Sequence, residues 1–324
     1  MSTFFYNRAK GELEPEIILG GRMMRLAYAS PCRKLLSLPL FGTALCSRLL
    51  GWYANRGFSR GRIDATIREL KIDMGDFEVP KEGFKCFNEF FARKLKQGAR
   101  PFAADGLCSP ADCRLTIYPE LHEDSCIPVK GADFSVTELL FGLNPPPKTG
   151  TPDDDRWDLA KEFKDGSLCV FRLCPSDYHR FHFPDNGKIL DSWRIPGRYD
   201  SVHPIALEQK IKVFTSNVRH VSMMELEHFG LAAYVEVGAF GVASIHNTFS
   251  GEAFLRGDEK GYFDFGGSTV IMVFGKGAVT YDRDLLEQSE NGVECLIKAG
   301  EHIGSSSLNC VLGRTKPCAD NNQQ

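Results

Sequence analysis

The sequence lacks an apolar run that could cross a membrane. The longest uncharged stretch near its N-terminus, Leu35 to Ser47, has 13 residues and is interrupted by Pro39, whereas a spanning helix needs about 20 residues. A secretory signal peptide is not predicted either, because the first apolar stretch follows several glutamates and has no clear cleavage region. The N-terminal part is therefore expected to lie on a membrane rather than to span it.

Patterns that bind metals or form disulfide frameworks are also missing. The eleven cysteines are an odd number and include no CxxC pair. We therefore expect reduced thiols in a cytosolic compartment, buried as small core side chains. Because the chain has no HExxH motif and no other ligand cluster at a familiar spacing, no metal site is predicted.

Acidic residues are absent from Ile17 to Ile63. This segment carries eight Lys or Arg and the whole chain has a formal net charge of −3, so the remainder carries −11. Nucleic-acid-binding proteins usually present a basic surface, whereas the body of this protein is acidic, so nucleic acid is not expected as a partner. Within the segment, apolar residues alternate with basic ones around Trp52 and Tyr53, which fits amphipathic helices on anionic lipid. A basic helical subdomain packed on the core fits equally well.

The composition that remains is that of a soluble globular protein. Of the 324 residues, 43% are hydrophobic and 25% are charged, which supports one large core or two smaller ones. Helices are predicted over Asp64 to Leu70 and Cys86 to Leu95, the second with an aromatic face that belongs in a core.

Beyond Pro101 the sequence changes to short β-rich runs separated by Gly, Pro, Asp and Asn, as in antiparallel sheets. These runs are Leu168 to Leu173, Ile211 to Phe214, Ala232 to Val237, Val242 to Ile245 and Thr269 to Phe274. The predicted fold class is α+β. Residues 81–324 would form a mainly antiparallel β-sheet core, and residues 1–80 would form a helical, membrane-associating region.

The first group of residues that could carry chemistry is Ser109-Pro110-Ala111-Asp112. A proline-fixed turn could hold the Asp112 carboxylate rigidly, although an Asp in a turn more often just caps backbone amides. This motif is weak on its own.

The second group is CPSDYHRFHFPDNG, Cys174 to Gly187, which places His179 and His182 three residues apart. Imidazoles are the side chains most readily used as acid or base near neutral pH, and a pair can divide two proton transfers. The plainer interpretation is a pair of hydrogen-bonded histidines at the end of a strand.

The third group is Gly266-Gly267-Ser268-Thr269, which opens an apolar β-run. A serine after two glycines is commonly a simple turn. The same arrangement lets the Ser268 hydroxyl reach the Gly267 carbonyl, because glycine tolerates strained backbone conformations. It is not the GxSxG elbow of α/β-hydrolases.

Together these groups resemble the phosphatidylserine decarboxylase family, whose members are pyruvoyl-dependent and form from a proenzyme. The resemblance runs from about Phe84 to Phe274 and rests on site residues as well as on fold-level likeness. Besides the three groups, it includes FNEFFARKLKQGARPF (Phe87 to Phe102), VKGADFSVTELLFG (Val129 to Gly142), VHPIALEQ (Val202 to Gln209), TSNVRH (Thr215 to His220) and FGLAAYVEVGAFGVASI (Phe229 to Ile245).

The resemblance implies a self-processing triad of Asp112, His182 and Ser268. His182 would take the proton of Ser268, Asp112 would orient the imidazole, and the alkoxide would attack the Gly267 carbonyl. Cleavage between Gly267 and Ser268 would give a β chain, residues 1–267, and an α chain, residues 268–324, that begins with a covalent pyruvoyl group from Ser268. This group would form a Schiff base with the substrate amine, in place of pyridoxal phosphate. His179 would transfer a proton or contact the lipid phosphate.

The resemblance also implies conversion of phosphatidylserine to phosphatidylethanolamine and CO2 at the cytoplasmic side of the cell membrane, by a peripheral enzyme that could be a homodimer. A pyruvoyl-dependent decarboxylase of a free amino acid such as tryptophan is the alternative. A second Gly-Ser-Ser at Gly304 to Ser306 lacks the flanking motifs and is rejected as the cleavage site. One departure from the family pattern is Cys113, at a position where the family commonly has Gly. If the backbone there needs a positive φ, a cysteine would be strained.

Overall fold

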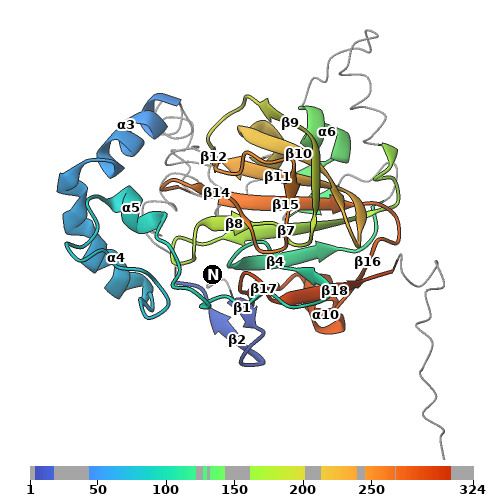
Figure 1. Cartoon of the computed structure of the whole chain (residues 1–324), viewed down its shortest axis with the longest axis horizontal. Helices are drawn as coiled ribbons and strands as arrows, with labels where there is room; N and C mark the ends of the chain where they lie inside the picture. Colours follow the sequence, from blue (N-terminus) through green and yellow to red (C-terminus); the bar gives the residue numbers. More distant parts are fainter. Residues whose placement is uncertain are drawn as a thin grey trace, which may run out of the picture.

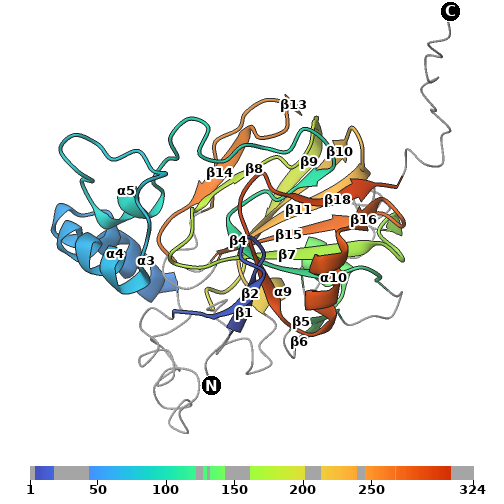
Figure 2. The same cartoon turned by 90° about the horizontal axis from the view of Figure 1, so that it is seen from below.

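The computed structural model describes residues 4–17, 44–121, 127–129, 132–142, 161–200, 213–238, 245–266 and 268–307. The helices α3, α4 and α5 gather at one end of the molecule, and the sheets with the remaining helices form the rest (Figures 1 and 2). The helical segments are α3 (Ala44–Ala54), the 3-10 helix η1 (Gly57–Arg62), α4 (Ile63–Leu70), α5 (Phe87–Phe91), α6 (Val136–Phe141), α9 (Val213–Ser216) and α10 (Arg283–Glu290).

A ten-stranded sheet forms the centre, in the order β13-β9-β10-β11-β15-β7-β4-β17-β1-β2. Neighbouring strands are antiparallel except β1 and β17, which are parallel. The strands are β1 (Phe4–Asn7), β2 (Glu12–Pro15), β4 (Cys113–Tyr118), β7 (Ser167–Leu173), β9 (Gly187–Ile195), β10 (Arg219–Leu226), β11 (Gly230–Gly238), β13 (Ala253–Phe254), β15 (Ser268–Phe274) and β17 (Glu294–Ile297).

Smaller sheets complete the body. Two have three strands each, in the orders β12-β14-β8 and β16-β18-β3, and one pairs β5 with β6. Their strands are β3 (Leu107–Cys108), β5 (Ile127–Val129), β6 (Ala132–Phe134), β8 (Arg180–His182), β12 (Ile245–Asn247), β14 (Glu259–Phe263), β16 (Val279–Tyr281) and β18 (His302–Ser306). The α+β class with mainly antiparallel sheets is thus confirmed.

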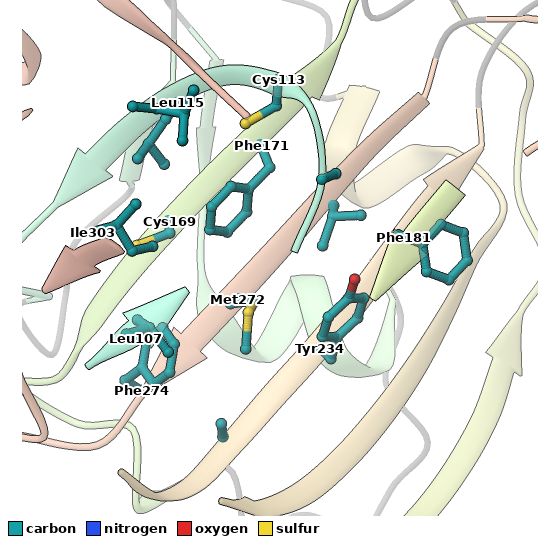
Figure 3. Close-up of a cluster of buried hydrophobic side chains, with 14 of the residues drawn as sticks. Leu107, Cys113, Leu115, Cys169, Phe171, Phe181, Tyr234, Met272, Phe274 and Ile303 are labelled. Carbon is teal, nitrogen blue, oxygen red and sulfur yellow. The ribbon is translucent and has the colours of Figure 1, made fainter. Parts of the chain in front are cut away.

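The middle strands of the central sheet, among them β7 and β15, are buried on both faces, which explains why β15 reads as a continuous apolar run. Successive side chains of a strand point to opposite faces. Met272 and Phe274 accordingly pack with Phe171 and Tyr234 in one core (Figure 3). Ile271 and Val273 pack in a second core on the other face. The alternation places Ser268 on the same face as Met272.

The helices α4 and α5 pack around a third, aromatic core. Phe87, Phe90 and Phe91 are all buried in it, as the predicted aromatic face requires. The helix itself is shorter than the predicted Cys86 to Leu95, because α5 ends at Phe91. Leu95 lies beyond its end but still packs against the same core.

One predicted strand, Ile211 to Phe214, differs from the structure in its described part. Val213 and Phe214 belong to the single helical turn α9, closed by the hydrogen bond from the Asn217 amide to the Val213 carbonyl at 3.0 Å. Their apolar character reflects burial in the second core rather than an extended backbone. The predicted strand Val242 to Ile245 lies outside the described residues except for Ile245, which begins β12.

The N-terminal membrane-binding helices are not confirmed. Much of the basic segment, residues 18–43, lies outside the described residues. Its described remainder forms α3 and η1. In the part of the chain that the structure describes, no helix has the length and apolar character needed to cross a bilayer.

Candidate active site

Ser268 begins the central strand β15, between β11 and β7 (Figure 1). It pairs with Gly238 on one side and Leu173 on the other, and it is fully buried. Gly267 lies outside the described residues. Gly266, two residues before Ser268, has a φ of 156°, a backbone conformation that residues with a side chain rarely adopt. This conformation favours glycine at position 266.

The Ser268 hydroxyl is hydrogen-bonded to His179. Its Oγ lies 2.9 Å from Nδ1 of the imidazole, and the opposite ring nitrogen, Nε2, lies 2.9 Å from the Cys174 carbonyl oxygen. A carbonyl can only accept, so Nε2 carries the proton. In the neutral ring Nδ1 is then the acceptor, and the Ser268 hydroxyl donates to it. This is the arrangement of a nucleophile and its base.

The surroundings of His179 keep its ring neutral. Burial, assisted by the positive charge of Arg93, lowers the pKa of His179 from 6.5 to about 3. The Phe91 ring stacks on the imidazole with centroids 3.8 Å apart and planes inclined by 25°. A neutral imidazole with a fixed tautomer can accept the Ser268 proton as soon as the hydroxyl attacks.

His182 is directed to other partners than the predicted one. Its Nδ1 donates to the Gly257 carbonyl at 2.9 Å, and its Nε2 lies 3.0 Å from the Tyr178 hydroxyl. Both ring nitrogens are therefore engaged, and among the described residues it is His179 that bonds Ser268. The predicted contact between His182 and Ser268 is thus replaced by one from the other histidine of the same motif.

Asp112 is buried in a cluster of positive charges. Arg100 contacts its two oxygens at 3.0 and 2.9 Å, the Lys298 ammonium lies at 3.2 Å, and the Ala299 amide donates at 2.9 Å. Burial would raise the pKa of Asp112, but these bonds and charges outweigh it and lower the pKa. The carboxylate is ionised, and the hydrogen bonds of the described residues do not join it to His182 or Ser268.

Cys113 is accommodated without strain. It begins β4 and is buried in the first core. Among the described non-glycine residues only Lys71 and Asp165 have a positive φ, so the backbone at Cys113 does not need the glycine of the common family pattern.

Sequence reasoning identified the motifs Cys174 to Gly187 and Phe87 to Phe102 but not every side chain or carbonyl in them that contacts His179 or His182. The Cys174 carbonyl, the Tyr178 hydroxyl and the Phe91 ring were not singled out as site groups, although all three lie in stretches that were. Their roles depend on which way a side chain or carbonyl points. Spacing alone does not carry that signal.

The chain matches known proteins over most of its length. A model of the phosphatidylserine decarboxylase family matches residues 87–305. The phosphatidylserine decarboxylase proenzyme of Clostridium botulinum (strain 657 / Type Ba4) is 41% identical over 304 residues, which cover 93% of this chain and 98% of that protein. This chain belongs to the phosphatidylserine decarboxylase family.

Two further relatives agree with this membership. The phosphatidylserine decarboxylase proenzyme of Clostridium beijerinckii is 39% identical over 306 residues, covering 94% of this chain and 99% of the relative. That of Ruminiclostridium cellulolyticum is 38% identical over 314 residues, covering 96% and 99%. Asp112, His179, His182 and Ser268 all lie within the range that matches the decarboxylase family model.

Proposed function

We infer that this chain is a phosphatidylserine decarboxylase that forms its own pyruvoyl group from Ser268. The observation that carries the inference is the buried Ser268 hydroxyl donating to a neutral His179 at the start of a central strand, in a chain of this family. Conversion of a serine to a pyruvoyl group requires a base beside its hydroxyl, and Ser268 and His179 meet this requirement. The carbonyl of the pyruvoyl group would bind the substrate amine and take up the electrons left by departing CO2.

Self-cleavage starts with the proton of Ser268. His179 Nδ1 accepts it while Oγ attacks the Gly267 carbonyl carbon, and collapse breaks the peptide bond and leaves an ester on Oγ with a free amine at Ser268. Elimination releases the carboxylate of residues 1–267 and turns the former serine into dehydroalanine. Addition of water and loss of ammonia leave a pyruvoyl group at the start of residues 268–324. The two products are the β and α chains.

The place of Asp112 and His182 in this reaction remains a prediction. Burial lowers the pKa of both His179 and His182, and the Asp112 charge opposes that shift at each ring. Support of a protonated imidazole by Asp112 is the effect that its predicted role requires. We propose that His179 makes the direct contact with the Ser268 hydroxyl. Asp112 would support the protonated imidazole through its charge, and His182 would assist without contacting Ser268.

The substrate assignment is tested with the purified enzyme. Release of CO2 from phosphatidylserine in mixed micelles is expected, with none from free serine or free tryptophan. The relatives described above are named as phosphatidylserine decarboxylases, which leaves the free amino acid alternative without support. Activity on the free amino acids alone would overturn the lipid assignment.

The helical end of the molecule offers a surface for the bilayer that holds this substrate. We propose that the helices within residues 1–80 bind the membrane and that residues 81–324 form the catalytic domain of a peripheral enzyme on the cytoplasmic side of the cell membrane. Residues 4–15, which were predicted to belong to the membrane-associating region, instead add β1 and β2 to the central sheet of the catalytic domain. Leu49, Trp52 and Phe58 are 59%, 54% and 60% exposed. The Arg56 guanidinium lies 5.2 Å from the centre of the Trp52 ring. Apolar side chains beside arginines suit an anionic lipid surface. We also propose that the enzyme is a homodimer, and analytical ultracentrifugation measures this oligomeric state.

Removal of the aromatic side chains tests this surface. The double variant Trp52→Ser/Phe58→Ser is expected to bind phosphatidylserine vesicles at least about tenfold more weakly, because two half-exposed rings lose their burial in lipid. Vesicle co-sedimentation measures the binding. The matched control is Leu255→Ser, since Leu255 is 65% exposed but follows β13 in the sheet body. Equal binding of the double variant and the wild type would contradict the proposed surface.

A further inference from the structure

The carboxylate of Glu16 reaches the active-site motif from the far N-terminus. Glu16 directly follows β2, and its side chain is only 5% exposed. Its Oε1 accepts hydrogen bonds from the Arg172 guanidinium and from the Cys174 thiol, both at 2.9 Å. Glu16 therefore joins residues that lie more than 150 positions later in the chain, with separations of 156 and 158.

Cys174 connects this carboxylate to the base of the reaction. Its thiol donates to Glu16, and its carbonyl accepts from Nε2 of His179. Its amide donates to the Asp177 carboxylate at 2.8 Å, and the Arg172 guanidinium donates to its sulfur at 3.3 Å. The side chain and both backbone groups of Cys174 are thus held, so its carbonyl has a fixed direction.

The charge states of the two groups support this link. Burial raises the pKa of the Cys174 thiol well above its usual value, so the thiol keeps the proton that it donates. Burial acts against ionisation of Glu16, but the Arg172 charge and the thiol bond outweigh it and lower the pKa of Glu16. A charged acceptor in a dry environment makes strong hydrogen bonds.

We propose that Glu16 is a positioning residue for self-cleavage at Ser268. Through the Cys174 thiol, and together with the Asp177 amide that donates to the same carbonyl at 2.8 Å, Glu16 fixes the carbonyl that holds the proton of His179 on Nε2. This leaves Nδ1 free for the Ser268 proton. Because it concerns the same reaction, this inference rests on the proposed function. A loosened carbonyl lets the ring turn or change tautomer, and a misplacement of about 1 Å can cost a reaction about 100-fold.

The test follows self-cleavage of freshly translated full-length chain on a denaturing gel. Glu16→Gln, which keeps the shape but removes the charge, is expected to slow conversion at least about tenfold. The matched control is Glu14→Gln, two residues earlier, because Glu14 pairs with Lys10 at the surface. Glu14→Gln is expected to convert at the wild-type rate.

A double-mutant cycle separates positioning from general damage. Cys174→Ala removes the donor, so adding Glu16→Gln to it is expected to slow conversion no further, whereas independent effects would multiply. Cys174→Ser keeps a hydrogen-bond donor. Relative to Cys174→Ala, it is expected to recover most of the wild-type conversion rate when Glu16 is present, but little of that rate in the Glu16→Gln background. A merely structural role gives no such dependence.

The outcomes distinguish this inference from the function on which it rests. If the wild type converts and Glu16→Gln converts equally fast, or if the Glu16 and Cys174 effects multiply, the positioning role is wrong while cleavage at Ser268 stands. If the wild type does not convert, or if Ser268→Ala still does, the proposed function itself is wrong.

Discussion

Ser268→Ala is expected to leave a single chain of 324 residues with no decarboxylase activity. Without the hydroxyl there is no attack on the Gly267 carbonyl and no source for the pyruvoyl group. Intact mass under denaturing conditions measures the result. The wild type should give two chains that divide between residues 267 and 268, and the smaller should have the mass expected for a pyruvoyl terminus rather than a serine terminus.

The rejected Gly-Ser-Ser sequence provides a matched control for this experiment. Ser305 lies in β18 and is exposed, with its hydroxyl 3.4 Å from His302 Nε2. Ser305→Ala should therefore be cut and active like the wild type. An uncut wild-type chain that nevertheless decarboxylates phosphatidylserine would contradict the pyruvoyl mechanism, as would normal cleavage of Ser268→Ala.

His179→Asn is expected to slow self-cleavage by about 100-fold to 10,000-fold, the usual contribution of a positioned base. His182→Asn should slow it less, because the ring of His182 bonds Tyr178 and Gly257 rather than Ser268. A time course of both variants on a denaturing gel decides between the observed contact and the predicted triad. A larger loss in His182→Asn would favour the triad.

The pH dependence of the same reaction follows from the environment of His179. Because burial and the Arg93 charge lower the pKa of His179 to about 3, the ring remains an unprotonated base well below neutral pH. Conversion should therefore show no fall due to His179 protonation between about pH 7 and about pH 5, where an unperturbed imidazole would take up its proton. A fall centred near pH 6.5, the ordinary histidine value, would contradict the assignment.

Strands buried on both faces could be predicted well from the sequence. The runs Leu168 to Leu173 and Thr269 to Phe274 differ from β7 and β15 by one residue each at their starts. Such runs are apolar throughout, so composition alone marks them. Val213 and Phe214 are equally apolar but helical, because a short apolar run shows burial and not backbone conformation.

Which histidine faces Ser268 could not be predicted from the residues. His179 precedes the short strand β8 and His182 ends it, so the direction of each ring depends on how that strand joins β14. The partners of Asp112 pose the same difficulty. Arg100 precedes Asp112 in the chain, while Lys298 follows it by 186 residues, and only the folded sheet brings these side chains together.

The position of β15 has a consequence for how this protein is made. The proposed cut would fall at the start of a strand that is hydrogen-bonded on both sides, to β11 and to β7 (Figure 1). Residues after the proposed cut also supply β17, which pairs with β4 and β1. The precursor assembles this sheet in a first-order process. A cut and denatured protein would have to rebuild the sheet from two separate chains, at a rate that falls with dilution. If the proposed cut occurs, the peptide bond between residues 267 and 268 therefore favours the first assembly of the sheet, whereas refolding after the cut depends on protein concentration.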